Sequence, residues 1–325
     1  MKRYPRIFHA MALFTAGVLV PALAAAQSNY PSKSVRIIVP FPAGGSNDML
    51  ARYFGDKLTE RLGQQSVIDN RGGANGIIGT EMAANAPADG YTLLIVSTSY
   101  TMNAALRKLP YDVEKSFDPI SMFGTSPNSI VVHPGAGLST LKEIVSRARS
   151  SPGSMLYAST GVGGFNHFGG ELFKKLAGID LVHVPYKGGG PAMIDLMAGH
   201  IPMMFSSLSQ VLPHVRNGKL KLVVIGAAKR SPAVPEIPTF AEAGYPGYEV
   251  SVWWGISAPA GVPKGIGQQL IKAFDGILAD PVTRKRLDAE AAEPRHATPE
   301  EFRKIIREEV VKWQAVAKSA GIQLQ

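Results

Sequence analysis

Short apolar runs rich in β-branched residues alternate with helical stretches along this chain, and this alternation constrains the fold more than any other feature. The first runs are residues 35–39, 66–68 and 91–96, and helical stretches at about 47–62 and 77–85 separate them. Strand, helix and strand at this spacing predict a layered α/β structure with parallel strands.

The alternation resumes after Pro127 and then breaks at a connector. Strands are expected at 129–132, 155–158, 181–184, 203–205 and 220–225, with helices at 138–150, 166–176 and 192–198. Residues 231–247 carry four prolines and two glycines, a density that predicts a connector. Beyond it, we expect a strand at 250–256 that returns to the first series, followed by helices at 264–278 and 299–318.

These two series predict a two-lobed α/β fold of the periplasmic-binding-protein (Venus flytrap) type. Each lobe is expected to be a mainly parallel sheet flanked by helices. The first lobe would be discontinuous, with residues 27–125 and 250–325, and the second would span 126–249. Chain crossovers near 120–130 and 245–255 would then form a hinge between the lobes.

The first 26 residues have the features of a signal peptide. Lys2, Arg3 and Arg6 precede an apolar run at 10–20, and three alanines offer a cleavage site near Ala26. The alternative is a membrane anchor, which the short apolar run and its interruption at Pro21 disfavour. We therefore expect a free protein in the periplasm.

The charge of the chain does not favour nucleic acid as a partner. The formal net charge is +9, and it would fall to +6 without residues 1–26, which hold three basic residues and no acidic residue. No basic tract is interleaved with aromatic residues. A mild positive field would attract anionic solutes, although an unspecific basic background explains the excess equally well.

Catalytic and cofactor motifs are missing from the sequence. The chain has no cysteine, no Gly-x-Ser-x-Gly elbow, no phosphate-binding Walker loop and no histidines at metal-ligand spacing. Lys187 has the chemistry for a Schiff base, but a lysine beside a glycine run more often supports a loop or faces solvent. We expect no enzyme activity, no cofactor and no metal site.

Glycine- and hydroxyl-rich loops follow the predicted strands in both lobes. They are residues 40–48, 70–79, 97–99, 158–167, 186–191 and 206–207. Open α/β sheets bind ligands at the carboxyl ends of their parallel strands, where such loops gather. Their recurrence predicts a polar cavity for a small ligand between the lobes.

The first of these loops suits a carboxylate. Gly44 and Gly45 allow backbone amides to turn toward a ligand, and the helix that follows adds partial positive charge at its N-terminus. The alternative is an ordinary tight turn in which Ser46 or Asn47 caps the helix. Two further questions stay open at this stage: whether His167 lies near the ligand or is structural, and whether either Trp253 or Trp254 faces the cavity.

The loops resemble a known family, the substrate-binding receptors of tripartite tricarboxylate transporters, or Bug family. The matching motifs are PFPAGG at 40–45 with Asp48 and Arg52, NRGGANG at 70–76, PADGYTLL at 87–94, ASTG at 158–161 with His167, and VPYKG at 184–188. Together and in this order they are specific, and they span essentially the whole chain beyond residue 26.

The resemblance implies a carboxylate ligand held by backbone amides, hydroxyls and ordered water, with few charged side chains. It places residues 40–46, 75–78, 97–98 and 159–164 against the ligand. With the loops after the other strands, the expected site comprises Pro42, Ala43, Gly44, Gly45, Ser46, Asn75, Gly76, Ile77, Ile78, Ser97, Thr98, Ser159, Thr160, Gly161, Gly163, Gly164, His167, Tyr186, Lys187 and Ser206.

The resemblance also implies partners. Family members bind di- and tricarboxylates, aromatic acids, amino acids and neutral amides, and the loops do not distinguish among these. We expect a monomer that delivers a small organic acid to the membrane subunits of a tripartite transporter. The alternative is a periplasmic sensor that presents the solute to a membrane signalling partner.

Overall fold

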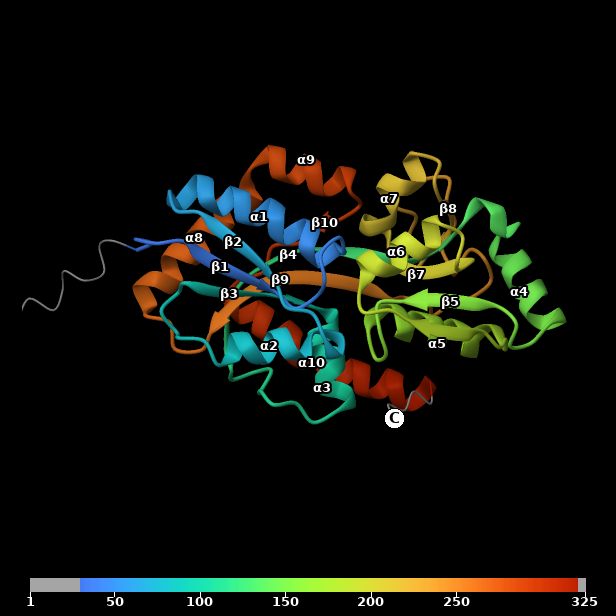
Figure 1. The fold of residues 1–325 in the computed structure, drawn as a ribbon, viewed down its shortest axis with the longest axis horizontal. Coiled ribbons are helices and arrows are strands. Elements are labelled where there is room, and N and C mark those ends of the chain that lie inside the picture. Colours follow the sequence, from blue (N-terminus) through green and yellow to red (C-terminus); the bar gives the residue numbers. More distant parts are fainter. Residues whose placement is uncertain (1–29, 321–325) are drawn as a thin grey trace, which may run out of the picture. The chain divides into compact units, whose positions relative to one another are not determined.

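The strands of the protein pair into one continuous mixed sheet with helices on both faces (Figure 1). The computed structural model describes residues 30–320, so the expected signal peptide at 1–26 lies outside the described residues. The strand order is β2-β1-β3-β9-β4-β7-β5-β6, and β8 and β10 also pair with β4. None of the described helices is long and apolar enough to cross a membrane.

The first lobe contains the strands that begin and end the chain. Its strands are β1 (Val35–Val39), β2 (Ser66–Asn70), β3 (Thr92–Ser97), the first part of β4 (Phe117–Val132), β9 (Ser251–Pro259) and β10 (Glu293–Pro294). Its helices are α1 (Ser46–Leu62), η1 (Ala74–Gly76, a 3-10 turn), α2 (Ile77–Ala84), α3 (Thr98–Leu106), α8 (Lys264–Ala279), α9 (Pro281–Ala289) and α10 (Pro299–Ala320). The strands β1, β2 and β3 are parallel, whereas β9 runs antiparallel to β3 and β4.

The second lobe repeats this plan. Its strands are the second part of β4, β5 (Leu156–Ser159), β6 (Val182–Pro185), β7 (Met203–Ser207) and β8 (Lys221–Ile225). Its helices are η2 (Pro134–Ala136, a 3-10 turn), α4 (Leu141–Ser150), α5 (Phe165–Ala177), α6 (Gly189–Met197) and α7 (Leu208–Arg216). Here β5, β6 and β7 are parallel, and β4 is antiparallel to β7 and β8.

The chain passes between the lobes at two adjacent points. The strand β4 pairs with β9 up to Pro127 and with β7 from Asn128 onward. The Asn128 amide also donates a hydrogen bond of 2.8 Å to the carbonyl of Val250, immediately before β9. The first crossover therefore lies inside one unbroken strand, and the lobe boundaries expected after residues 125 and 249 stay a prediction.

Two helices begin where the sequence predicted only loops. Ser97 ends β3 and α3 begins at Thr98, and Ser206 and Ser207 belong to β7, from which α7 continues directly. The first six residues of α3 are all buried, so the helix lacks the alternation of apolar and polar faces by which helices are recognised in a sequence.

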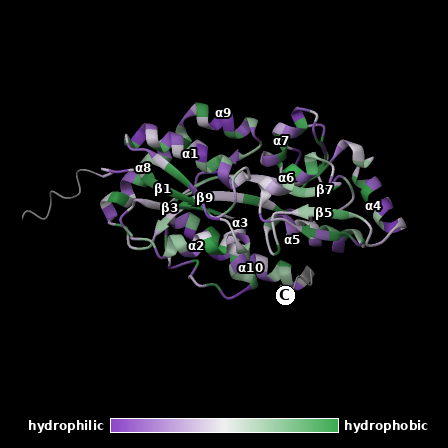
Figure 2. Cartoon of the chain, in the orientation of Figure 1, coloured by the Kyte–Doolittle hydropathy of each residue, from purple (hydrophilic) through white to green (hydrophobic). Residues whose placement is uncertain are grey.

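Each lobe has its own apolar core, and hydrophobic residues concentrate along the strands in Figure 2. In the first lobe Trp253 packs edge-on against Phe302 with ring centroids 5.4 Å apart, and its indole nitrogen donates to Glu309. Its neighbour Trp254 is fully buried. Both tryptophans belong to the core, and neither lines the cavities described below.

Candidate functional site

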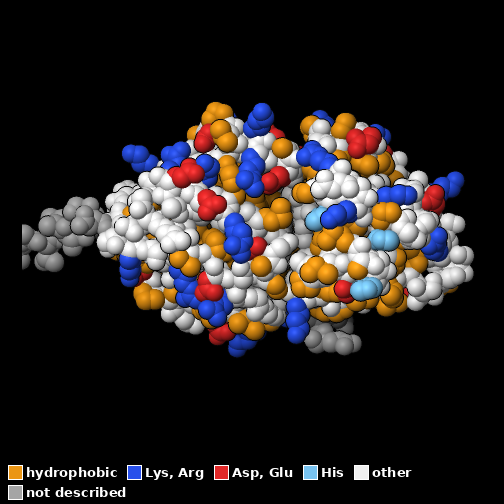
Figure 3. Space-filling view, turned by 45° about the horizontal axis from the view of Figure 1, so that its top comes forward, with side chains coloured by type: hydrophobic (Ala, Val, Ile, Leu, Met, Phe, Trp, Pro, Cys, Tyr) orange, Lys and Arg blue, Asp and Glu red, His pale blue; other side chains and the backbone are white. Residues whose placement is uncertain are grey.

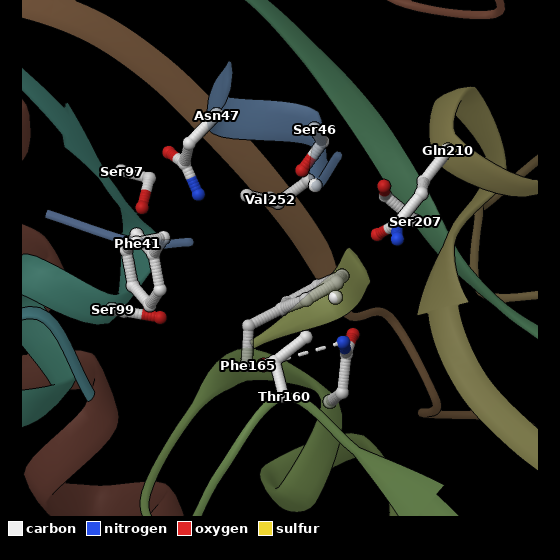
Figure 4. Close-up of a pocket in the computed structure, with 13 residues that line it drawn as sticks. Phe41, Ser46, Asn47, Ser97, Ser99, Thr160, Phe165, Ser207, Gln210 and Val252 are labelled. Carbon is white, nitrogen blue, oxygen red and sulfur yellow. Dashed lines mark hydrogen bonds between the residues drawn. The ribbon is translucent and has the colours of Figure 1, made fainter. Parts of the chain in front are cut away.

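Two adjoining cavities lie between the lobes. Counted together with the space at their mouths that is open to solvent, the inner cavity has a volume of about 420 Å³ and the outer cavity about 1210 Å³. Phe41 and Thr160 line both. The inner cavity is lined from the first lobe by Phe41, Gly45, Ser46, Asn47, Ser97, Ser99 and Val252, and from the second by Thr160, Phe165, Asn166, Gly189, Ser207 and Gln210 (Figure 4).

Five helices begin at the wall of the inner cavity. Residues of the N-terminal ends of α1, α3, α5, α6 and α7 line it, and none of these helices has a side-chain hydrogen bond from its N-cap residue. The N-cap of α1 is Gly45, so the alternative in which Ser46 or Asn47 caps that helix is wrong. Helix N-termini without a cap from the N-cap side chain offer N–H groups and partial positive charge, and both favour an anion. In α7 the Ser209 amide already donates to the Ser126 hydroxyl at 3.0 Å, so this helix contributes mainly its partial charge.

The cavity walls carry almost no formal charge. Among the described residues that line the two cavities, Lys187 is the only charged one, and it is exposed at the outer cavity. On the face drawn in Figure 3, lysine and arginine side chains are spread over both lobes. An anion in the inner cavity would therefore be held by backbone and neutral polar groups.

Gln210 offers an unused donor to the inner cavity. Its side chain is 4% exposed, and its Nε2 has no partner among the described residues. Its Oε1 accepts a hydrogen bond of 3.2 Å from the Ser206 hydroxyl, which leaves the amide nitrogen to donate. Buried donors without a partner are rare, so this nitrogen points to a missing ligand or water.

The turn that opens α1 is anchored by a buried carboxylate. Asp48 accepts hydrogen bonds from the Gly44 amide (3.0 Å), the Asn70 side chain (3.0 Å) and Arg52 (3.1 Å). Burial acts to raise the pKa of Asp48, but these donors outweigh it and lower the pKa below its ordinary value. Asp48 is therefore ionised and supports the loop from behind.

The loop between β5 and α5 is braced by two neutral histidines. The Gly163 amide donates to Nδ1 of His167 (3.2 Å), and the Ser159 hydroxyl lies 2.6 Å from Nε2 of His183. The two imidazole rings stack with centroids 4.2 Å apart. Burial lowers the pKa of both rings, that of His183 to about 3, so both are neutral near pH 7.

In the outer cavity, Asn75 lies between the lobes. It has a left-handed backbone with a φ of 53°, and its side chain donates to Asn103 (3.2 Å), which in turn donates to the Asn75 carbonyl (2.9 Å). Its Oδ1 is buried without a partner among the described residues. At the opposite side Tyr186 donates to Asp195 at 2.8 Å, beside Lys187.

The structure divides the expected site residues into three groups, and Thr160 belongs to the first two. Those that line the inner cavity are Gly45, Ser46, Ser97 and Thr160, and those that line the outer cavity are Pro42, Asn75, Gly76, Thr160, Gly161, Tyr186 and Lys187. The remainder line neither: Ala43, Gly44, Ile77, Ile78, Thr98, Ser159, Gly163, Gly164, His167 and Ser206. Several of these support the site from behind; the Thr98 hydroxyl, for example, accepts from the Trp253 amide at 2.9 Å.

Sequence reasoning missed most of the inner wall. Asn47, Ser99, Phe165 and Asn166 lie within the expected loops but one or two residues beyond the segments placed against the ligand (40–46, 97–98 and 159–164), in the first turns of the helices that follow. That position was a usable signal, because the first turn of a helix faces the same ligand as the loop before it. Gln210 and Val252 had no such signal, since α7 was not predicted and Val252 lies in a strand.

Comparison with known proteins agrees with the fold. The model of the "Tripartite tricarboxylate transporter family receptor" family matches residues 50–322. Protein BugT of Bordetella pertussis is 35% identical over 314 residues, which are 96% of this chain and 95% of BugT.

Three solved structures are similar over most of their length. A periplasmic transporter is 41% identical with a TM-score of 0.88, covering 91% of this chain and 100% of its own. Rpa4515 of R. palustris with adipate is 34% identical, with a TM-score of 0.88 and coverage of 90% and 99%. MatC from Rhodopseudomonas palustris with bound malate is 31% identical, with a TM-score of 0.83 and coverage of 88% and 99%.

These matches confirm the predicted two-lobed fold and the resemblance inferred from the loops. The family and its solved members are solute-binding receptors rather than enzymes. This chain therefore belongs to the tripartite tricarboxylate transporter receptor family, also known through its Bug members.

Proposed function

We propose that this protein is a periplasmic receptor that binds a small organic acid with its carboxylate in the inner cavity. The observation that carries the proposal is the convergence on one cavity of five helix N-termini that have no hydrogen bond from an N-cap side chain, joined by the free Nε2 of Gln210. Each of these groups donates hydrogen bonds or carries partial positive charge, which is the complement of a carboxylate.

The outer cavity would hold the rest of the solute. Phe41, Pro42 and Val162 supply apolar surface there, and Lys187 supplies a positive charge at the rim. Rpa4515 and MatC were solved with adipate and malate, both of which carry two carboxylates. A ligand with a second acidic or polar group beyond the first carboxylate fits this arrangement.

Ligand capture would close the two lobes. Both lobes contribute to the inner wall, so a ligand contacts both only when they come together, and its binding energy then favours the closed state. We place the hinge at the two crossovers and keep the lobe limits as 27–125 with 250–325 and 126–249. The closed receptor would present its solute to the membrane subunits of a tripartite transporter.

A thermal-shift panel tests the proposal. Purified protein is heated with adipate, malate, glutamate or benzoate and, in parallel, with the carboxamide counterpart of each acid. An acid present at 100 times its Kd should stabilise the fold by about 2.7 kcal/mol, while its amide should shift the Tm far less. Amides that raise the Tm as much as their acids would contradict a carboxylate site, as would a panel in which no acid raises it.

A further inference from the structure

A chain of hydrogen bonds runs from the crossovers to the inner cavity. The Tyr248 hydroxyl donates to Oδ1 of Asn128 (2.9 Å), and Nδ2 of Asn128 donates to Oδ1 of Asn166 (3.3 Å). Nδ2 of Asn166 then donates to Oγ1 of Thr160 (3.4 Å), the bond drawn dashed in Figure 4. Thr160 and Asn166 line the cavity, whereas Tyr248 and Asn128 are 2% and 0% exposed behind it.

Tyr248 determines the direction of this hydrogen-bond chain, that is, which group at each step donates and which accepts. Burial raises the pKa of Tyr248 well above its ordinary value, so the hydroxyl keeps its proton. Among the described residues, the Asn128 oxygen is the acceptor recorded for that proton. If both amides were turned round, the Tyr248 proton would be buried without an acceptor, an arrangement that folded proteins rarely contain.

The direction decides what Thr160 offers to a ligand. Because the Thr160 oxygen accepts from Asn166, the proton of its hydroxyl is free to donate into the cavity. In the reversed chain the hydroxyl would donate to Asn166 and could only accept from a ligand. The donor state matches a carboxylate, which has acceptor atoms alone.

The packing around Tyr248 shows that the chain is built into the fold. A Cβ atom at Gly169 would lie 2.7 Å from the Tyr248 hydroxyl and 2.9 Å from Oδ1 of Asn128, so α5 can approach these groups only with glycine there. Tyr248 precedes β9 at the second crossover, and Asn128 stands where β4 changes lobes. The two residues that fix the direction of this hydrogen-bond chain therefore lie at the hinge, and Thr160, whose hydrogen-bonding role depends on that direction, lines the cavity.

We propose that Tyr248 and Asn128 are positioning residues that orient Asn166 and thereby make the Thr160 hydroxyl a hydrogen-bond donor to the ligand carboxylate. The inference rests on the proposed function, since it assumes a carboxylate in the inner cavity. A hydrogen bond to a carboxylate is stronger than one to a neutral carbonyl. The chain should therefore favour an acid over its amide, whatever the remainder of the solute.

Acetate and acetamide test this, because they have nearly the same shape and differ in charge and in the NH₂ group that replaces one carboxylate oxygen. Each is titrated by NMR into wild type, Tyr248→Phe, Thr160→Val and the double variant. Tyr248→Phe should weaken acetate binding about threefold to tenfold and acetamide binding less. In the Thr160→Val background, the same substitution should change neither affinity, because its effect passes through that hydroxyl.

Tyr53→Phe is the matched control. Tyr53 is also buried and donates to a neutral oxygen, Oγ1 of Thr283 at 2.8 Å, and neither residue lines the inner or the outer cavity. The Tyr53→Phe variant should leave the affinities for acetate and acetamide unchanged. Equal losses for Tyr248→Phe with and without Thr160→Val would overturn the proposal, as would wild-type affinities in Tyr248→Phe.

A measurement on the ligand-free wild-type protein tests the direction of the hydrogen-bond chain even if the Tyr248→Phe variant does not fold. Nuclear Overhauser contacts of the Asn128 side-chain NH₂ should be with Asn166, and those of the Asn166 NH₂ with the Thr160 methyl group. Contacts of the Asn128 NH₂ with the Tyr248 ring would show the reversed direction and refute the inference. Wild type that does not bind acetate would instead contradict the proposed function.

Discussion

The loop before α1 and the loop before α5 face the same cavity from opposite lobes, and they are alike in conformation but not in support. Both end in a glycine N-cap of nearly the same geometry, with φ and ψ of −89° and 171° at Gly45 and −85° and 166° at Gly164. Behind the first stands an ionised carboxylate, Asp48, and behind the second stand two neutral imidazoles, His167 and His183. The same binding geometry can thus be held by charge in one lobe and by uncharged groups in the other.

The surroundings of the two N-cap glycines also differ. A Cβ at Gly164 would lie 2.9 Å from Oδ1 of Asn75 in the opposite lobe, whereas a Cβ at Gly45 would have its nearest neighbour, the Gly189 amide nitrogen, at 3.7 Å. The φ of Gly45 is one that any residue adopts, and the left-handed residue of this turn is Gly44, with a φ of 84°. A Cβ at Gly45 should therefore lower the ligand affinity only through the cavity space that it occupies, and it should cause no backbone strain.

The largest difference in ligand affinity between the two loops should appear when Gly164 and Gly45 are each replaced by alanine. Gly164→Ala should lower the affinity for a panel acid by about tenfold or more, or roughly 1.4 kcal/mol, because the methyl group meets Asn75, whose side chain Asn103 holds in place. Gly45→Ala should cost less than about threefold. Calorimetric titration of both variants measures this, and equal losses would mean that the lobes do not meet at Gly164 in the bound state.

The hydroxyl groups of the two loops should matter about equally. Ser46 and Thr160 each line the inner cavity from one lobe. Removing either hydroxyl, in Ser46→Ala or Thr160→Ala, should cost about 0.5–1.5 kcal/mol, which is roughly a threefold to tenfold loss of affinity. Both variants should also reduce ligand-induced compaction in small-angle scattering. Loss in one variant alone would assign binding to a single lobe.

Mildly acidic pH should weaken the histidine support of the loop before α5 and leave the Asp48 support of the loop before α1 unchanged. An exposed histidine has a pKa near 6.5, whereas the folded pKa of His183 is about 3. Between these values the unfolded chain takes up a proton that the folded chain does not, so stability falls as the pH falls from about 6.5 toward 3. The groups that face this ring are Tyr157, His167 and Lys174, with Glu171 beside Tyr157.

His183→Gln should flatten that dependence. The Tm of wild type should fall more steeply between pH 6.5 and 4.5 than the Tm of the variant. Asp48 stays ionised over this range because its folded pKa lies below its ordinary value of 3.8, so the support of the first loop is unaffected. Identical Tm profiles would show that His183 is already protonated in the folded protein.

A small effect is also expected at Arg52. Its side chain is 55% exposed, and Asp48 keeps the Gly44 amide and Asn70 as donors without it. Partly exposed ion pairs contribute about 0–1 kcal/mol, so Arg52→Gln should change ligand affinity by less than about fivefold. High salt should reduce even that difference. A loss as large as that of Gly164→Ala would mean that the ion pair, rather than the other donors, holds the loop.

The alternation of apolar runs and helical stretches was enough to predict the two-lobed fold, and the glycine loops were enough to indicate segments of each lobe that line the cavities. Both are local features: a buried parallel strand must be apolar, and a helix that starts at a ligand needs residues that leave its amides free. The loop at 40–45 could therefore be recognised without knowledge of what lies opposite. The helix α3 could not, because its first six residues are all buried and conceal its helical period. The helix α7 does carry apolar residues at helical spacing, Leu208, Val211, Leu212 and Val215, but it was not predicted.

Only the tertiary structure decided which side chains meet in the cavity. Asn166 and Thr160 are six residues apart, but Asn128 and Tyr248, which orient them, come from two distant crossovers. Gln210 reaches the cavity from a helix that the sequence did not reveal, while His167, in an expected loop, turns inward to stack on His183. The physical reason is that a sequence pattern records burial and backbone conformation, whereas the direction of a hydrogen bond depends on every partner within reach, and the packing of the two lobes supplies those partners.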